Sequence, residues 1–233
     1  MIIGNGMISK VFKSYDYSNK VLIFASGVSN SNEVLERNFF REESLLKDVI
    51  SKYPEKLLIY FSSCSIYDDS MNTKPYIKHK LEMEALIQRN CSNFYIFRLP
   101  QVVGFARNQT LVNFLFSSVL NNKKIDIYKY STRNLISTVD VYKVASYLLE
   151  NKIYLNEITN IATPKNTLVI DIVKIIEDIT ELSFNYDLIN CGHPIEINID
   201  KILNLDLKFG FNQPNYLENV LSDFFTLSAH ELN

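Results

Sequence analysis

Tyr76 and Lys80 are the two residues whose types and spacing could do chemistry. They stand four positions apart at the start of a segment with helical periodicity, and residues at this spacing share one face of a helix. A neighbouring ammonium favours the ionised form of a phenol, so the pair could pass a proton to or from a substrate oxygen. The alternative is that both residues lie on a solvent-facing helix without any catalytic role.

A hydroxyl-rich segment precedes this pair. The apolar run Leu57–Phe61 ends in Ser62-Ser63-Cys64-Ser65-Ile66-Tyr67, as expected of a buried strand that opens into a polar site. A serine hydroxyl here could hydrogen-bond the oxygen that receives the proton.

A glycine-rich turn follows the first apolar residues of the chain. Such a turn lets the backbone approach a pyrophosphate closely, and the helix that follows offers free amides to it. The third glycine position of the usual pattern holds Ser9, so an ordinary strand-to-helix turn is the alternative interpretation. The residues predicted to contact a dinucleotide in this turn are Gly4, Asn5, Gly6, Met7 and Ile8.

The next apolar run, Val21–Ala25, arrives after an unusually short connection and can be placed in two ways. As the second strand of a dinucleotide-binding sheet, it lacks the acidic residue that would bind the adenosine ribose, because Ser26 lies there instead. As the fourth strand, it implies that the usual second and third strands are deleted. We prefer the second placement, which makes adenine recognition unconventional. Ala25, Ser26, Gly27 and Ser62 are then further cofactor-binding candidates.

Strands must alternate with helices to position these residues. The predicted class is α/β, a Rossmann-like parallel sheet with a small C-terminal α+β substrate lobe. The predicted strands are Met1–Ile3, Val21–Ala25, Leu57–Ser62, Phe94–Arg98, Ile125–Tyr128 and Glu157–Ile161. The predicted helices are Glu36–Ser51, Tyr76–Asn90, Thr110–Asn121, Thr138–Asn151, Val169–Thr180 and Tyr216–Phe225. Residues 229 to 233 are predicted to be a frayed tail.

The serine-rich strand end followed by Tyr-x-x-x-Lys resembles the active site of extended short-chain dehydrogenases, a family of sugar-nucleotide epimerases, dehydratases and ketoreductases. The resemblance implies that Ser63, Tyr76 and Lys80 form the catalytic set, with Ser63 hydrogen-bonding the substrate oxygen. It also implies NADH or NADPH as cofactor, with Lys80 holding the nicotinamide ribose. Dehydratases of the family carry an acidic pair where this chain has Cys64-Ser65, which disfavours dehydration. We expect Cys64 to be a buried thiol beside the substrate, and His79 and Lys78 to be solvated.

Two later segments extend the resemblance. Phe97–Gly104 resembles a strand motif of the family, which implies that Pro100 borders the nicotinamide and Gln101 faces the sugar. Thr132–Val141 resembles a segment that contacts the nucleotide, which makes Arg133 a substrate-binding candidate; a salt-bridged lobe residue is the alternative. The substrate-binding candidates are Ser63, Cys64, Ser65, Gln101 and Arg133. We expect residues 1–105, joined by helix 138–151, to bind the dinucleotide and residues 106–233 mostly to bind substrate.

Composition excludes several other classes of protein. The chain has 233 residues, 47% of them hydrophobic, and a formal net charge of -2. The cationic residues are scattered, which argues against a nucleic-acid partner. No apolar run is long enough to span a membrane and no signal peptide is visible, so we expect a cytoplasmic protein. The three cysteines lack metal-ligand spacing, so we expect reduced thiols and no metal. A homodimer is compatible with these features.

The favoured function is reduction of a 4-keto (6-deoxy) sugar nucleotide by NADH or NADPH, in the synthesis of surface-polysaccharide sugars. A nucleotide-sugar 4-epimerase is the nearest alternative, because it would use the same residues. An alternative of another class is a non-catalytic protein that binds a nucleotide sugar or a dinucleotide, since a fold alone does not establish activity.

Overall fold

The computed structural model describes residues 1–104, 110–205, 209–211 and 213–231, with side chains described up to Thr226. The chain divides into two compact units. The first comprises Met1–Leu99 and Thr138–Ile161, and the second comprises Pro100–Ser137 and Ala162–Asn233. The first unit holds the glycine turn and the Tyr76–Lys80 pair. That the first unit binds a dinucleotide and the second a substrate stays a prediction.

A parallel five-stranded sheet organises the first unit. Its order is β1-β2-β3-β4-β9. These strands span Ile2–Ile3, Val21–Phe24, Leu57–Ser63, Phe94–Leu99 and Ile158–Asn160, respectively. The apolar, β-branched and aromatic side chains of the three central strands are almost all buried, as expected of a parallel sheet covered on both faces. The predicted α/β class with a Rossmann-like sheet is confirmed.

The placement of the second apolar run is also settled by this sheet. β2 pairs directly with β1, with Ile2 opposite Ile23 and Ile3 opposite Phe24. β1 therefore lies at the edge of the sheet among the described residues, and no strand is paired beyond it. In a complete sheet two further strands would stand on that side. The prediction that they are deleted is confirmed.

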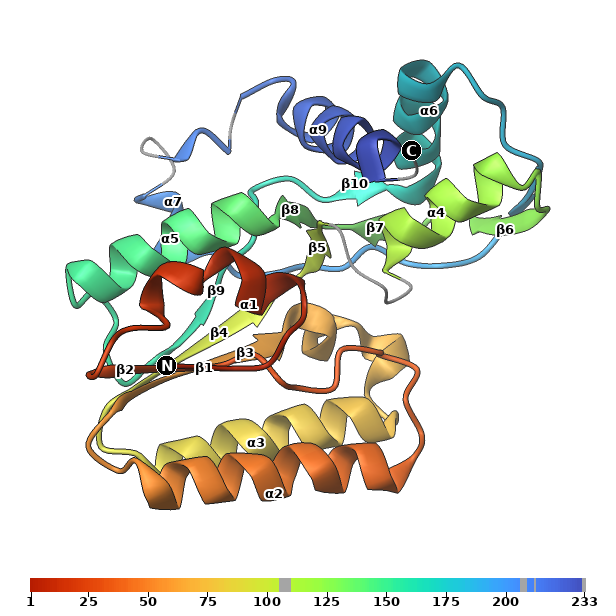
Figure 1. The fold of residues 1–233 in the computed structure, drawn as a ribbon. Helices are drawn as coiled ribbons and strands as arrows, with labels where there is room; N and C mark the ends of the chain where they lie inside the picture. Colours follow the sequence, from red (N-terminus) through yellow and green to blue (C-terminus); the bar gives the residue numbers. More distant parts are fainter. Residues whose placement is uncertain (105–109, 206–208, 212, 232–233) are drawn as a thin grey trace. The chain divides into compact units, whose positions relative to one another are not determined.

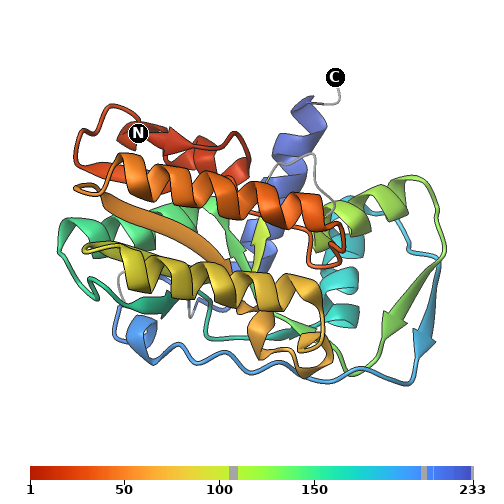
Figure 2. The ribbon, with the colours of Figure 1, turned by 90° about the horizontal axis from the view of Figure 1, so that it is seen from below.

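Helices cover both faces of this sheet (Figure 1). The long helices α2, Glu36–Lys52, and α3, Pro75–Asn90, lie side by side on one face, as Figure 2 shows. The short α1, Met7–Val11, and α5, Thr138–Glu150, cover the other face. Apolar residues of α2 and α3 pack onto β2, β3 and β4, including Leu46, Met83 and Ile87, all at most 2% exposed.

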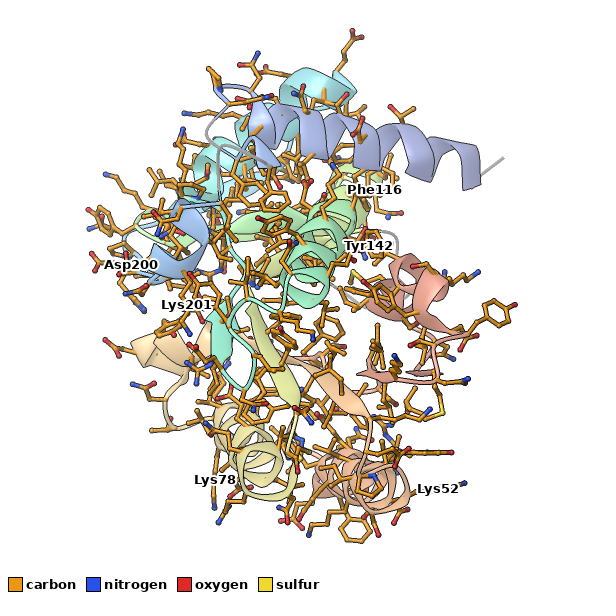
Figure 3. The ribbon with its side chains drawn as sticks, turned by 90° about the vertical axis from the view of Figure 1, so that its left-hand side faces the viewer. Lys52, Lys78, Phe116, Tyr142, Asp200 and Lys201 are labelled. Carbon is orange, nitrogen blue, oxygen red and sulfur yellow. The ribbon has the colours of Figure 1, made fainter. Side chains whose placement is uncertain are left out.

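Aromatic rings fill the face beneath α1 and α5. Phe12 is fully buried, and its ring centroid lies 5.4 Å from that of Phe61 on β3 and 5.2 Å from that of Tyr142 on α5. Figure 3 shows Tyr142 on α5 beside α1. A single turn η1, Lys13–Tyr15, then leads the chain toward β2. Only this turn lies between α1 and β2, where a complete sheet of this type would have two further strands.

The second unit is built from three strand pairs and several helices. β5, Gln101–Val103, pairs with β8, Leu135–Ser137; β6, Ile125–Tyr128, with β11, Tyr186–Ile189; and β7, Thr132–Arg133, with β10, Thr167–Leu168. The helices are α4, Leu111–Leu120; α6, Val169–Thr180; α7, Asp200–Leu203; and α9, Tyr216–Glu231. Their apolar side chains share one core, in which Leu115, Val173 and Leu221 are almost fully buried.

One expectation about this half needs correction. We expected the last helix to end at Phe225 and a frayed tail to begin at residue 229, but α9 continues to Glu231. In the described part of the chain no helix is long and apolar enough to cross a membrane.

Candidate functional site

The turn after β1 is shaped by two glycines with different tasks. Gly4 has a φ of +126° and lies against β2, because a Cβ there would stand 2.3 Å from the Ala25 carbonyl oxygen. Gly6 is the N-cap of α1 and is open, since an added Cβ would meet no heavy atom within 4 Å. Ser9, at the third glycine position, is buried and its hydroxyl donates to the Gly6 carbonyl at 2.7 Å. Gly4 thus fixes the turn and Gly6 leaves its outer side accessible.

The carboxyl end of β3 carries the predicted serines. Ser63 caps the short turn η2, Cys64–Tyr67, because its Oγ accepts from the Ser65 N–H at 3.0 Å. Ser62 is 6% exposed, and its Oγ has no hydrogen-bond partner among the described residues. A buried hydroxyl without a partner is costly unless a ligand or water completes it. Ser62 therefore fits its predicted role as a cofactor contact.

The thiol beside these serines is inert. Cys64 is 3% exposed and donates to the Arg98 carbonyl oxygen at 3.4 Å. Burial raises the pKa of this thiol to about 12, so it stays protonated near neutral pH. A buried structural thiol is what the sequence predicted, and a role in contacting substrate remains a prediction.

Tyr76 and Lys80 lie in the first turns of α3, which begins with Pro75 at a position where a missing N–H costs nothing. The Lys80 Nζ lies 5.8 Å from the centroid of the Tyr76 ring, so the structure brings the two together. Both are buried, with Tyr76 4% and Lys80 2% exposed. Tyr76 packs with Val28 and Ile77 in a small apolar cluster. The alternative of a solvent-facing pair is therefore wrong.

A buried carboxylate that the sequence reasoning missed holds Lys80. Glu42 of α2 is fully buried and accepts from Lys80 Nζ at 3.0 Å, from Tyr60 Oη at 2.6 Å, and from the Val28 N–H. His79 Nε2 lies 3.0 Å from its second oxygen. We call Glu42, Tyr60, His79 and Lys80 the buried polar cluster. The expectation that His79 is solvated is wrong, whereas Lys78 extends into solvent, as Figure 3 shows.

The electrostatics of the buried polar cluster favour a charged Glu42. Burial alone would raise the pKa of this carboxyl, but the Lys80 ammonium and the hydrogen bonds from His79, Tyr60 and the Val28 N–H outweigh it and lower the pKa to about 2. Burial and the nearby carboxylate raise the pKa of Tyr60 well above its ordinary value. Glu42 is therefore an anion and Tyr60 a neutral donor across the ordinary pH range.

Helix α2 also fixes the loop that follows β2. Arg41 donates from Nη1 to Ser26 Oγ at 3.1 Å and from Nη2 to the Ser26 carbonyl at 2.9 Å. One residue later, Glu42 accepts from the Val28 N–H on the inner side. Gly27 stands between these anchors, and a Cβ there would lie 2.8 Å from Lys80 Nζ and 2.9 Å from Glu42 Oε1. The loop predicted to border a cofactor is thus rigidly attached to the buried polar cluster.

A second polar network joins β4, α3 and β9. Arg98 donates to both oxygens of Glu84, from Nε at 2.9 Å and from Nη2 at 2.5 Å. Its Nη1 donates to Tyr67 Oη at 3.0 Å, and Asn160 Nδ2 donates to the same oxygen at 2.9 Å. A bidentate arginine–carboxylate pair has a fixed geometry, so this network stiffens the carboxyl ends of the strands.

The remaining predicted contacts, Pro100, Gln101 and Arg133, belong to the second unit. Gln101 begins β5, which pairs with β8. Arg133 lies on β7, and its Nη1 donates to the Thr132 carbonyl at 2.7 Å. Their predicted contacts with a nicotinamide, a sugar and a nucleotide stay predictions.

Several groups at the strand ends of the first unit could bind a dinucleotide. The open Gly6 turn at the carboxyl end of β1, the unpartnered Ser62 hydroxyl on β3, and the glycine-containing loop after β2 are all at strand ends where parallel sheets bind ligands. The residues present therefore fit a bound dinucleotide. Within the described residues, no group of three or more histidines, cysteines and carboxylates could hold a metal ion.

Comparisons with known proteins support the fold. No family model matches the sequence, and a comparison with curated proteins finds no match. Among solved structures, MoeE5 in complex with UDP-glucose and NAD is 16% identical with a TM-score of 0.74, covering 92% of this chain and 80% of that one. A dTDP-4-dehydrorhamnose reductase from Clostridium acetobutylicum is 14% identical with a TM-score of 0.73, covering 98% of both chains.

A UDP-glucose 4-epimerase is similar to the same degree, at 15% identity and a TM-score of 0.72, covering 99% of this chain and 84% of that one. Identities this low show a shared fold and leave the activity to be argued from the site. The fold implied by the extended short-chain dehydrogenase resemblance is therefore confirmed.

Proposed function

We propose that this chain reduces the keto group of a nucleotide-linked sugar with NADH or NADPH. One observation carries the proposal: Tyr76 and Lys80, four residues apart on α3, lie together, with the Lys80 ammonium 5.8 Å from the centroid of the Tyr76 ring. The structures of similar fold include complexes with NAD and with UDP-glucose, and a reductase of a dTDP-linked keto sugar that matches nearly the whole chain.

When bound, the reduced nicotinamide supplies a hydride to the keto carbon. Tyr76 donates its phenolic proton to the keto oxygen as that oxygen gains the electron pair of the broken π bond, and solvent later returns a proton to the tyrosinate. The positive charge of Lys80 stabilises the transient tyrosinate. Ser63 aligns the keto oxygen by a hydrogen bond, for which its hydroxyl keeps its own proton while its Oγ caps Ser65.

Lys80 has fewer free N–H donors than a lysine that faces solvent. An ammonium has three N–H donors, and Glu42 Oε1 and Tyr60 Oη lie 3.0 Å and 3.1 Å from Nζ. A ribose hydroxyl would therefore have to take the third donor. Because Glu42 holds the ammonium in a fixed place, Lys80 supplies its charge to Tyr76 without moving.

The sheet edge favours a reductase over an epimerase. A 4-epimerase keeps its cofactor through a cycle of oxidation and reduction, which requires tight retention of the adenosine half. The strands that would stand beyond β1 and help to hold adenosine are missing from the described sheet. A reductase, which exchanges its cofactor after each turnover, tolerates this loss better.

Tyr76→Phe tests the proposal, since it removes the proton donor and keeps the ring packed against Val28. Consumption of NADH and NADPH is followed with a dTDP- or UDP-linked 4-keto-6-deoxyhexose. We expect turnover to fall by roughly 100-fold or more while cofactor affinity is kept. Lys78→Met, on the same helix but exposed, is the control. Wild-type turnover in Tyr76→Phe would rule out Tyr76 as the acid, and interconversion of 4-epimers without net NADH consumption would identify the epimerase instead.

A further inference from the structure

Ser26 connects the Arg41 guanidinium to the glycine turn. Gly4 is in backbone contact with the end of β2, since a Cβ on it would stand 3.1 Å from the Ser26 nitrogen as well as 2.3 Å from the Ala25 oxygen. The Arg41 guanidinium donates hydrogen bonds to the Oγ and the carbonyl oxygen of the same Ser26. The turn after β1, the loop after β2 and the Arg41 guanidinium thus form one continuous set of contacts.

The Arg41 side chain is exposed, and none of the ion pairs among the described residues involves it. The carboxylate next to it in sequence, Glu42, points inward and is paired with Lys80. Two hydrogen bonds to Ser26 hold the guanidinium in place, so its loss of freedom on binding a ligand would be small.

Because the strands beyond β1 are missing, a positive charge near the glycine turn could supply contacts to the cofactor that those strands would otherwise make. In a complete dinucleotide-binding sheet, residues beyond β1 contribute to holding the adenosine half. Here β1 is the edge of the described sheet, so contacts to that half must come from the turn after β1 and the loop after β2. A planar guanidinium offers several N–H donors in a geometry that matches a phosphate group.

We propose that Arg41 is a phosphate-binding residue for the ADP half of the nicotinamide cofactor, in place of contacts from the deleted strands. The inference rests on the proposed function, because it takes the glycine turn as the cofactor site. Arg41 would act together with the open turn at Gly6, where the backbone has room for an anion. The phosphate is either the pyrophosphate, which both cofactors share, or the 2′-phosphate of NADPH.

Calorimetric titrations of wild type and Arg41→Ala with NADH, NADPH, ADP-ribose and reduced nicotinamide mononucleotide test the proposal. Losing a charged hydrogen bond to phosphate should weaken binding roughly tenfold or more. A loss with NADH, NADPH and ADP-ribose, but not with the mononucleotide, would assign the pyrophosphate. A loss with NADPH alone would assign the 2′-phosphate. Arg41→Lys keeps the charge without the fork and should fall between wild type and Arg41→Ala.

Lys52→Ala is the matched control, because it removes one positive charge from the opposite end of α2, where Figure 3 shows Lys52 pointing outward. It should bind all four ligands as wild type does. If wild type binds NADH or NADPH and Arg41→Ala binds them equally well, the Arg41 proposal is wrong and the proposed function stands. If folded wild type binds neither cofactor, both are wrong.

Discussion

The buried polar cluster and the glycine turn differ in where their polar groups find partners. In the cluster, Glu42, Tyr60, His79 and Lys80 are at most 5% exposed, and the carboxylate is satisfied by donors from α3, β3 and the loop after β2. At the turn, Gly6 is exposed with no heavy atom near the site of a Cβ. The Glu42 carboxylate is therefore satisfied within the chain, whereas the turn leaves its backbone available to a ligand. Stability and binding should respond separately to changes in the two regions.

Breaking the buried ion pair should have the largest effect. Glu42→Leu leaves the Lys80 ammonium buried without its anion, and we expect the free energy of unfolding to fall by about 3–5 kcal/mol. Urea denaturation followed by circular dichroism measures it. Adding Lys80→Met should cost less than the sum of the single changes, because the second removes the unpaired charge. Glu43→Gln, next in sequence and more exposed, is the control; a loss below about 1 kcal/mol for Glu42→Leu would contradict the account.

Acidification should weaken the cluster in a defined pH range. The pKa of Glu42 is about 2 in the folded chain against an ordinary 4.5, so the unfolded chain binds a proton first as pH falls. The stabilisation is complete above pH 4.5, declines below it and is lost below about pH 2, on the order of 3 kcal/mol in total. Denaturation curves of wild type and Glu42→Gln between about pH 6 and pH 3 should show a shallower pH dependence in the variant. Parallel curves would mean that Glu42 is not held as an anion.

Gly27→Ala should have an intermediate effect. Its Cβ would enter the space between Lys80 Nζ and Glu42 Oε1, at 2.8 Å and 2.9 Å. Both atoms are fixed by other hydrogen bonds, so the ion pair must shift, and we expect a destabilisation of about 1–3 kcal/mol. Thermal unfolding monitors the change. A wild-type melting temperature would show that the loop after β2 can move away from the cluster.

Gly6→Ala should have the smallest effect on stability. The added methyl group meets no atom within 4 Å, and Gly6 has a φ of -77°, which any residue adopts. We expect the free energy of unfolding to change by less than about 0.5 kcal/mol. A larger loss in the same thermal assay would mean that the turn is built into the folded core and is not open to a ligand.

The sequence predicted the fold through local signals. Short buried strands such as Leu57–Ser63 and helices such as Val169–Thr180 have a clear period, and the short connection between β1 and β2 was enough to predict the deleted strands. The spacing of Tyr76 and Lys80 predicted their common face. In each case the information lies within a few residues of the feature.

Long-range pairing explains what was missed. Glu42 lies in the middle of a helix rich in charged residues, and nothing local distinguishes it from its more exposed neighbour Glu43. Its burial depends on Lys80 and Tyr60, which are far away in sequence. The one available signal is helical spacing, since Glu42 shares the buried face of α2 with Leu46 and Val49. Arg41 was missed for the same reason, because its partner Ser26 lies in a separate loop.

Direct titration of the cofactor onto wild type and Gly6→Val tests the central claim most directly. Circular dichroism first establishes that both proteins are folded, which the open space around Gly6 predicts. The account predicts that wild type binds NADH or NADPH and that Gly6→Val weakens binding roughly tenfold or more, because a side chain keeps the pyrophosphate from the backbone amides. Equal affinities for the two folded proteins, or no binding by wild type, would contradict it.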